Sequence, residues 1–397
     1  MSPVRHILTI NAGSSSIKFA LFDAGSALQR IVKGSIERIG LPEAKMTVQP
    51  SGSSDAESRP VSAPDHAAAA RELMQWIAAR SESAALSAIG HRLVHGGPKY
   101  SAPVRLDATI IEELRKLSPF DPEHMPHELK LAEALQRQYP ELPQVACFDT
   151  AFHHAMPRVA QLLPLPRSYQ AQGLRRYGFH GLSYAFLMQE LQRVAGAEAA
   201  RGRVILAHLG NGASLAAVCA GESVDTSMSF TPASGIPMST RAGDLDPGLV
   251  WYLARADGLD ARAFNTLINT QCGLLGVSET SPDMRDLLAR EDADPRAREA
   301  VDLFCYQVKK WVGAFAAALG GLDTLIFSAG IGERAAPVRA RICAGLEFLG
   351  IALDPARNAA HAALISPASG RVAVRVIPTD EEQMLAQLVG SLLWPPL

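Results

Sequence analysis

Three glycine-rich segments carry the residue types that a phosphate-binding site needs. They read NAGSSS at 11–16, HLGNG at 208–212 and SAGIGE at 328–333, and each follows a short apolar run. Glycine lets a ligand approach the backbone because it has no Cβ, and consecutive N–H groups form an anion-binding concavity. The first segment adds three hydroxyls and is followed by Lys18, and the second adds an imidazole and an amide. Taken alone, these first two segments are equally compatible with tight hairpin turns.

The third segment stands between an apolar run at 324–327 and a helix expected to begin near Ala336. A strand, a glycine turn and a helix in that order present backbone N–H donors to an anion or a nucleotide. The pattern G-x-x-x-x-G-K-[ST] occurs nowhere in the chain, which disfavours a P-loop NTPase.

The elements around these segments alternate between strands and helices, which predicts an α/β fold. Short apolar runs indicate strands at 7–10, 17–22, 88–94, 144–148, 204–208, 214–219, 324–327 and 372–377. Helical spacing appears at 65–80, 107–117, 127–138, 183–195, 247–256, 296–319 and 336–348. Ser281 before Pro282 predicts a further helix start, with serine as the N-cap and proline at the first position. Residues 50–63 are expected to form an exposed loop.

An approximate internal repeat divides the chain. ILTINAGSSSIKFALFD at 7–23 and VILAHLGNGASLAAV at 204–218 each read as an apolar strand, a turn of small residues and a second apolar strand. A length of 397 residues also exceeds what one hydrophobic core usually organises. We therefore expect two domains of related fold that face each other across a cleft, with both glycine tips suited to phosphate.

Composition excludes several classes of function. The formal net charge of −2 and the absence of a basic block argue against a nucleic-acid partner. The apolar run at 7–10 is too short for a signal peptide, and 311–319 is too short to span a bilayer, so we expect a cytoplasmic protein without membrane contact. The five scattered cysteines form no C-x-x-C pair and read as small buried hydrophobes.

The ordered motifs resemble those of the acetate kinase family over essentially the whole chain. Besides the three glycine segments they are HRLVHGG (91–97), FDTAFH (148–153), YGFHGLSY (177–184), DTSMSFTP (225–232), TRAGDLDPG (240–248), DMRD (283–286) and IPTDEE (377–382). The resemblance implies two duplicated ribonuclease H-like domains of the actin, sugar kinase and heat-shock ATPase superfamily, at 1–149 with 383–397 and at 150–382, flanking a nucleotide cleft. It also implies a homodimer and reversible transfer between ATP and acetate, giving ADP and acetyl phosphate, with Mg²⁺, for which Mn²⁺ can substitute.

The resemblance also assigns roles to single residues. The catalytic set is Arg92, Asp149, His180 and Arg241. Asn11 and Glu381 form the Mg²⁺ pair. The nucleotide contacts are Lys18, His208, Leu209, Gly210, Asn211, Gly212, Asp283, Met284, Arg285, Gly330, Ile331, Gly332, Glu333 and Arg334. The acid contacts are Arg92, Val94, His124, Phe179 and Pro232.

The chemistry of the reaction limits what these residues need to do. Phosphoryl transfer depends mainly on positioning and on neutralising charge, and arginine binds carboxylate or phosphate oxygens in a bidentate manner. Acetate is already ionised at neutral pH, so it needs no general base. Asp149 is therefore expected to polarise the surroundings of the acid, to orient a Mg²⁺ water, or both, and simple proton abstraction is disfavoured.

One stretch departs from the family pattern and leaves alternatives open. Glu123 stands where an apolar side chain usually lines the methyl pocket, which puts the choice between acetate and propionate or another short-chain acid in doubt. A non-catalytic ATP switch of the actin or heat-shock type is a rival hypothesis, but it has no need of the predicted acid site. A sugar kinase is less compatible still, because no acceptor site rich in Asp, Asn and Gln is evident.

Overall fold

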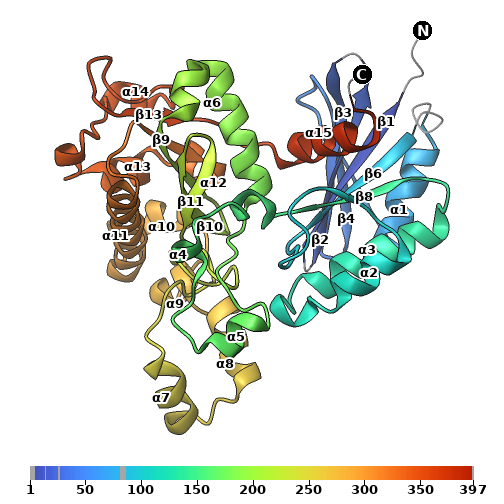
Figure 1. Ribbon diagram of the computed structural model, residues 1–397, viewed down its shortest axis with the longest axis horizontal. Coiled ribbons are helices and arrows are strands. Elements are labelled where there is room, and N and C mark those ends of the chain that lie inside the picture. The colour runs from blue at the N-terminus through green and yellow to red at the C-terminus, as the bar shows by residue number, and fades with distance from the viewer. Residues whose placement is uncertain (1–4, 14, 26, 81–85, 396–397) are drawn as a thin grey trace. The chain divides into compact units, whose positions relative to one another are not determined.

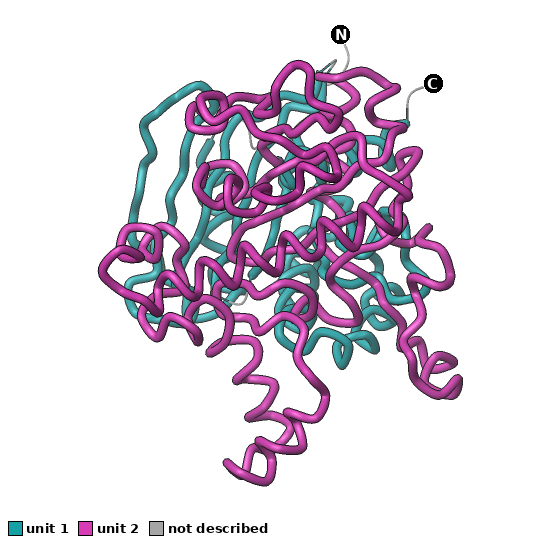
Figure 2. The backbone as a smooth tube through the Cα atoms, turned by 90° about the vertical axis from the view of Figure 1, so that its left-hand side faces the viewer, with its two compact units in different colours: residues 1–151, 380–397 teal, residues 152–379 magenta. Residues whose placement is uncertain are grey.

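The structure is a computed structural model that describes residues 5–13, 15–25, 27–80 and 86–395. The chain forms two compact units, 1–151 with 380–397 (unit 1) and 152–379 (unit 2), coloured separately in Figure 2. The sequence interpretation divided the chain after 149 and after 382. In the structure, 380–382 belong to unit 1 because the C-terminal helix begins at Glu381 and packs on the first sheet.

Unit 1 is built on an eight-stranded sheet with the strand order β5-β4-β3-β2-β1-β6-β8-β7 (Figure 1). Its strands are β1 (His6–Ala12), β2 (Ser16–Ala24), β3 (Leu28–Glu37), β4 (Lys45–Pro50), β5 (Glu57–Pro60), β6 (Leu86–Leu93), β7 (Val104–Arg105) and β8 (Gln144–Phe148). Its α-helices are α1 (His66–Ala78), α2 (Ala108–Arg115), α3 (Met125–Gln138) and α15 (Glu381–Leu393). β1 pairs antiparallel with β2 and parallel with β6, and β6 pairs parallel with β8.

Alternation along the strands gives this sheet two apolar faces. Ile89 of β6 packs in one cluster with Leu73 of α1 and Leu131 of α3. The next residue, Gly90, faces the opposite side, where a Cβ would lie only 2.7 Å from the side chain of Val389 in α15. Glycine at this position therefore allows α15 to approach the sheet closely. Helices thus cover both faces, which is why the strands read as near-continuous apolar runs.

Unit 2 repeats the central strand order of unit 1 in a five-stranded sheet, β11-β10-β9-β12-β13. Its strands are β9 (Arg203–Leu209), β10 (Ala213–Cys219), β11 (Glu222–Thr226), β12 (Thr324–Ser328) and β13 (Ala373–Val376). Its α-helices are α4 (Arg158–Gln161), α5 (Arg167–Ala171), α6 (Gly181–Arg201), α7 (Gly248–Ala256), α8 (Ala261–Thr270), α9 (Gly273–Ser278), α10 (Met284–Arg290), α11 (Pro295–Ala318), α12 (Ala329–Arg334), α13 (Ala336–Cys343) and α14 (Pro355–Ala359). β9 pairs antiparallel with β10 and parallel with β12.

The duplication predicted from the two hairpins is confirmed by this strand order. The prediction that 50–63 form a loop was wrong in part, because β5 lies within that range and pairs with β4. All four residues of β5 are exposed, so this edge strand carries no apolar alternation that a sequence could show. Among the residues described, no helix has the length and apolar character that crossing a membrane requires.

Candidate active site

The candidate residues of unit 1 lie at one edge of its sheet. Asn11 stands near the end of β1, opposite Arg92 in β6, and Asp149 directly follows β8. Because β1, β6 and β8 are neighbouring parallel strands, their carboxyl ends meet where α/β sheets place functional groups. Glu381 begins α15, and Asn11 Nδ2 donates a hydrogen bond to its Oε2 at 3.3 Å. Unit 1 therefore brings these four predicted residues together.

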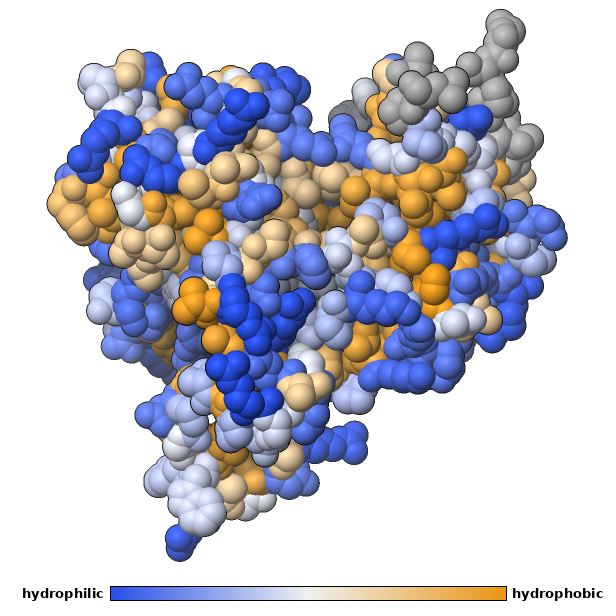
Figure 3. Space-filling view, in the orientation of Figure 1, coloured by the Kyte–Doolittle hydropathy of each residue, from blue (hydrophilic) through white to orange (hydrophobic). Residues whose placement is uncertain are grey.

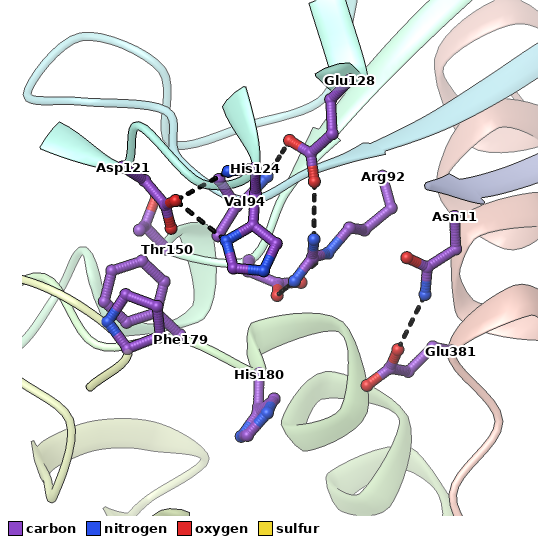
Figure 4. A network of polar contacts seen from close by, with 12 residues as sticks. Asn11, Arg92, Val94, Asp121, His124, Glu128, Thr150, Phe179, His180 and Glu381 are labelled. Carbon is purple, nitrogen blue, oxygen red and sulfur yellow. Dashed lines mark hydrogen bonds and ion pairs between the residues drawn. The ribbon is translucent and has the colours of Figure 1, made fainter. Parts of the chain in front are cut away.

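Arg92 is held by two buried carboxylates. Its Nε and Nη2 donate to Asp149 Oδ2 at 3.1 and 2.6 Å, and its Nη1 donates to Glu128 Oε1 at 2.6 Å, as the dashed line to Glu128 in Figure 4 shows. Burial disfavours the charged guanidinium, but the charges of Asp149 and Glu128 outweigh it and raise the pKa of Arg92. These contacts use three of the five N–H donors of arginine, which leaves two for a ligand.

Glu128 is a site residue that sequence reasoning missed. It lies in the first turn of α3, its side chain is 1% exposed, and its Oε2 accepts a hydrogen bond from Val94 N at 2.9 Å. Burial raises the pKa of Glu128 to about 7 against the opposing charge of Arg92. From the sequence alone, a glutamate in the first turn of a helix is explained by its favourable interaction with the helix dipole. No local pattern indicates that it has a partner in another element.

The surroundings of Asn11 and Glu381 fit a divalent cation. Burial raises the pKa of Glu381 to about 7, and the charges of Asp149 and Glu382 add to the rise. Asp149 Oδ1 is buried without a hydrogen-bond partner in the described part of the chain. The crowded carboxylates of Glu381 and Asp149, together with the unsatisfied Asp149 oxygen, suit Mg²⁺, which prefers oxygen ligands and few protein groups. Within the described ranges, no three His, Cys, Asp or Glu residues form a metal cage.

The predicted acid contacts are divided between the units. Val94 is buried and His124 half-buried in unit 1, whereas Phe179 and Pro232 belong to unit 2. His124 Nδ1 lies 2.9 Å from Asp121 Oδ1; burial opposes the charge of Asp121, but His124 outweighs it and lowers the pKa of that carboxyl. Glu123, the departure from the family pattern, is exposed. Its carboxylate is therefore not buried beside Val94.

In unit 2 the second glycine tip meets two predicted catalytic residues. A Cβ placed on Gly212 would lie 3.3 Å from His180 Nε2 and 3.5 Å from Arg241 Nη1. His180 stands just before α6 with a φ of 60°, a left-handed conformation that a non-glycine residue adopts only under constraint. Its Nδ1 lies 2.8 Å from Ser214 Oγ, and its ring stacks on His208 with centroids 4.2 Å apart. The tip, both histidines and Arg241 therefore form one cluster.

A chain of hydrogen bonds continues from this cluster to the third glycine segment. His208 Nδ1 lies 2.8 Å from Ser183 Oγ, which lies 2.7 Å from Thr379 Oγ1. Thr379 N in turn donates to Glu333 Oε1 at 3.3 Å. Ser183 and Thr379 are separated by 196 positions in the sequence, so no spacing pattern could have paired them.

The third glycine segment is a helix, not the turn that the sequence predicted. Gly330–Arg334 form most of α12, which follows β12 without a loop and packs on β9. A Cβ on Gly332 would lie 3.6 Å from Ala207 O, and one on Gly210 would lie 3.5 Å from Ala329 Cβ. The small residues thus let the start of α12 lie against the tip at 210–212.

The remaining predicted nucleotide contacts lie on β2 and at the start of α10. Lys18 is exposed on β2 opposite Asn11, and Ser14 lies outside the described residues. The helix predicted to start at Ser281 begins at Met284 with Asp283 as its N-cap, because Ser281 Oγ instead accepts from Asp283 N in a preceding turn. Asp283 pairs with the exposed Arg285. A pocket of about 420 Å³ beside α13 is lined by none of the predicted residues.

Comparisons with known proteins identify similar sequences and folds. The family model of the acetokinase family matches residues 6–387. An acetate kinase of Rhodopseudomonas palustris is 44% identical over 391 residues, which cover 97% of this chain and 98% of the relative. The crystal structure of Porphyromonas gingivalis acetate kinase has a TM-score of 0.87 at 36% identity, covering 96% of this chain and 98% of that one. A propionate kinase of Francisella tularensis has a TM-score of 0.91 at 33% identity, covering 97% and 98%.

The family match spans nearly the whole chain, and the two solved structures share its fold over almost their full lengths. These matches identify the chain as a phosphotransferase with a carboxyl group as acceptor. The chain belongs to the acetokinase family.

Proposed function

We propose that the protein transfers the γ-phosphoryl group of ATP to acetate, and that it catalyses the reverse reaction. A carboxylate oxygen of acetate forms a bond to the γ-phosphorus while the bond from that phosphorus to the β–γ bridging oxygen breaks, so the products are acetyl phosphate and ADP. The observation that carries the proposal is Arg92, a guanidinium fixed by Asp149 and Glu128 with donors to spare, next in the chain to the buried Leu93 and Val94. It offers a small acid both a charge and an apolar surface.

The residues of each unit have distinct tasks in this reaction. Arg92 binds and orients the acid, and Asp149 holds Arg92 from one side, which supports a positioning role over proton abstraction. His180, Arg241 and the N–H groups of the tip at 210–212 bind the phosphoryl oxygens, where charge spreads in the transition state. Asn11 and Glu381 would hold Mg²⁺, which would neutralise charge on the phosphates. The segment at 330–334 and residues 283–285 bind the adenosine.

Trapping the product tests the proposal. The protein is incubated with acetate, ATP, Mg²⁺ and hydroxylamine, and the acyl hydroxamate is measured by its colour with iron(III). Colour that requires both ATP and acetate, and that EDTA abolishes, is the expected result. ATP binding without hydroxamate would instead indicate the non-catalytic switch. Replacing Mg²⁺ by Mn²⁺ should restore colour after EDTA treatment.

Propionate is a second candidate acceptor, because the propionate kinase of Francisella tularensis shares the fold at a TM-score of 0.91. One methylene in an apolar pocket changes binding by about 1–3 kcal/mol, so the two acids can differ by only about 10- to 200-fold. The exposed position of Glu123 leaves Val94 as the apolar residue of unit 1 in the predicted acid set. Measuring kcat/KM for acetate, propionate and butyrate decides the order, and a preference for butyrate would contradict the assignment.

A homodimer is the proposed assembly, and unit 2 offers a surface for it. None of the side chains of α7 or α8 is buried, although α7 carries Trp251 and Tyr252, which are 68% and 65% exposed. Figure 3 shows pale and orange side chains among blue ones at the α7 end of unit 2. Exposed apolar surface of this kind is typical of association sites. Light scattering after size exclusion should give twice the chain mass for the wild type and a lower mass for Trp251→Glu.

We also assign the enzyme to the cytoplasm. All five cysteines are free thiols in the structure, which suits a reducing compartment that also supplies ATP. Acetyl phosphate is an activated acyl donor, so a following acyl transfer to the thiol of coenzyme A would lead to acetyl-CoA. Fractionation of the native host, with activity followed by the hydroxamate assay, tests the location.

A further inference from the structure

We propose that Glu128 is a positioning residue for the acid, because one carboxylate holds both the guanidinium of Arg92 and the backbone of Val94. The inference rests on the proposed function and concerns how the acid site is held in shape. Oε1 of Glu128 accepts from Arg92 Nη1 at 2.6 Å and Oε2 accepts from Val94 N at 2.9 Å. The group that binds the acid's charge and the residue that meets its methyl group are thereby fixed by the same side chain.

The location of Glu128 suits this task. It projects from the first turn of α3, and Figure 4 shows its carboxylate above the guanidinium of Arg92 and beside Val94. Asp149 binds the Nε side of the same guanidinium, so Arg92 is held from two directions. The side chain of Glu128 is 1% exposed, and water cannot readily replace either contact. Removing Glu128 would leave a buried N–H and part of a buried cation without an acceptor.

A carboxylate can perform this double task, and an amide cannot. Ionised glutamate has two acceptor oxygens, whereas glutamine has one acceptor oxygen and one NH₂ donor. The two N–H groups that face Glu128 are both donors, so in Glu128→Gln one of them must meet another donor. The isosteric variant therefore disrupts the site without opening a cavity.

Protonation should have the same effect as the amide, since it turns one oxygen into an O–H donor. The charged groups that face Glu128 are Arg92 from β6 and Asp121 and His124 from the segment before α3, with Asp149 and Glu381 acting on Arg92. Burial raises the pKa of Glu128 to about 7. The KM for the acid should therefore rise as the pH falls through about 7.

Steady-state kinetics test the proposal with the full-length enzyme. Glu128→Gln is compared with the wild type and with Glu133→Gln, which makes the same chemical change farther along α3 at a partly exposed residue that pairs with Arg115. Loss of one contact and the unsatisfied donor should raise the KM for acetate about tenfold. The KM for ATP should change less than about twofold, since unit 2 is untouched, and Glu133→Gln should match the wild type.

The outcomes separate the inference from the proposed function. Wild-type protein that makes no hydroxamate would refute the function itself. Active wild type with an unchanged KM for acetate in Glu128→Gln would refute only the inference, and a lower KM would mean that Glu128 competes with the acid for Arg92. The change in KM near pH 7 should be absent from Glu128→Gln, and its persistence would also count against the proposal. Circular dichroism and ATP-dependent thermal shifts verify that the variant is folded.

Discussion

Units 1 and 2 share one sheet order and place different chemistry at the ends of equivalent strands. In the sequence of each unit, an antiparallel hairpin is followed by parallel strands, with β1, β6 and β8 corresponding to β9, β12 and β13. The ends of the first set carry the amide of Asn11 and the full charges of Arg92 and Asp149. The end of β9 and its tip carry His208 and glycines, so unit 2 offers backbone donors and an imidazole there.

Under the proposed function, the one fold supports two modes of anion recognition. In unit 1 the guanidinium is held by buried carboxylates, and binding depends on charge balance. In unit 2 the cluster is built by close approach, since Gly212 leaves room for His180 and Arg241. Binding in unit 1 should be sensitive to the loss of a single charge. Binding in unit 2 should be sensitive to changes in how closely the side chains pack around the glycine tip. The predictions below examine that difference.

The largest effect is expected from Arg92→Ala. It removes the charge that binds the acid and leaves Asp149 and Glu128 without their cation, so kcat/KM for acetate should fall by about 10³ or more. The coupled ADP assay measures the loss. Arg105→Ala, an exposed residue on β7 of the same sheet, serves as the control. ATP binding to unit 2 should persist in a thermal-shift assay. Wild-type turnover in a folded Arg92→Ala variant would mean that the acid binds elsewhere.

His180→Ala tests the cluster at the glycine tip of unit 2. The imidazole lies against Gly212 and is fixed by Ser214 and His208, so it is a preorganised donor for a phosphoryl oxygen. Losing one such donor should lower kcat by about 10²–10³, while the KM for acetate changes little. His154→Ala, which removes an exposed imidazole of the same unit, should retain full activity. A rise in the acetate KM without a loss of kcat would contradict the assigned role.

The stability of the two units should respond differently to acid. In unit 2, burial lowers the pKa of His153 to about 4, below its ordinary value of 6.5. As the pH falls, His153 is therefore protonated in the unfolded chain before it is protonated in the folded one. The stability that the neutral, buried His153 provides above pH 6.5 is lost as the pH falls toward 4. Between pH 7 and pH 5 the loss is about 2 kcal/mol.

In unit 1 the titrating groups change the stability in opposite directions as the pH falls. His91, whose pKa burial also lowers to about 4, contributes the same loss as His153. The raised pKa of Glu128, about 7, means that the folded state binds a proton first, so stability is gained as the pH falls from 7 toward 4.5. Without Mg²⁺, Glu381 adds a gain of the same sign. Hydrogen exchange at pH 5 and 7, corrected for intrinsic rates, should show lost protection in β9 and β10 but not in β1 and β6. Equal losses in both units would contradict this assignment.

The sequence allowed the framework to be predicted but not the contacts that support the site. The buried strands were predictable because their apolar runs are continuous. The paired hairpins were predictable because both tips consist mainly of small residues. Arg92 and His180 could be named only through motifs. Glu128 and Ser183 could not be predicted, because their partners come from other elements and a glutamate or serine early in a helix has ordinary local explanations.

The smallest predicted effect concerns the hydrogen-bond chain that connects His208 with Glu333. Ser183→Ala removes the hydroxyl that contacts both His208 Nδ1 and Thr379 Oγ1, which frees the ring of His208 to rotate beneath His180. A net hydrogen bond contributes about 1 kcal/mol, so kcat/KM for ATP should fall about fivefold. The KM for acetate should stay constant, because none of the predicted acid residues belongs to this hydrogen-bond chain. Ser168→Ala, at an exposed residue of α5, is the matched control. If Ser183→Ala instead raised the KM for acetate, this hydrogen-bond chain would support acid binding, and its assignment to phosphate binding would be wrong.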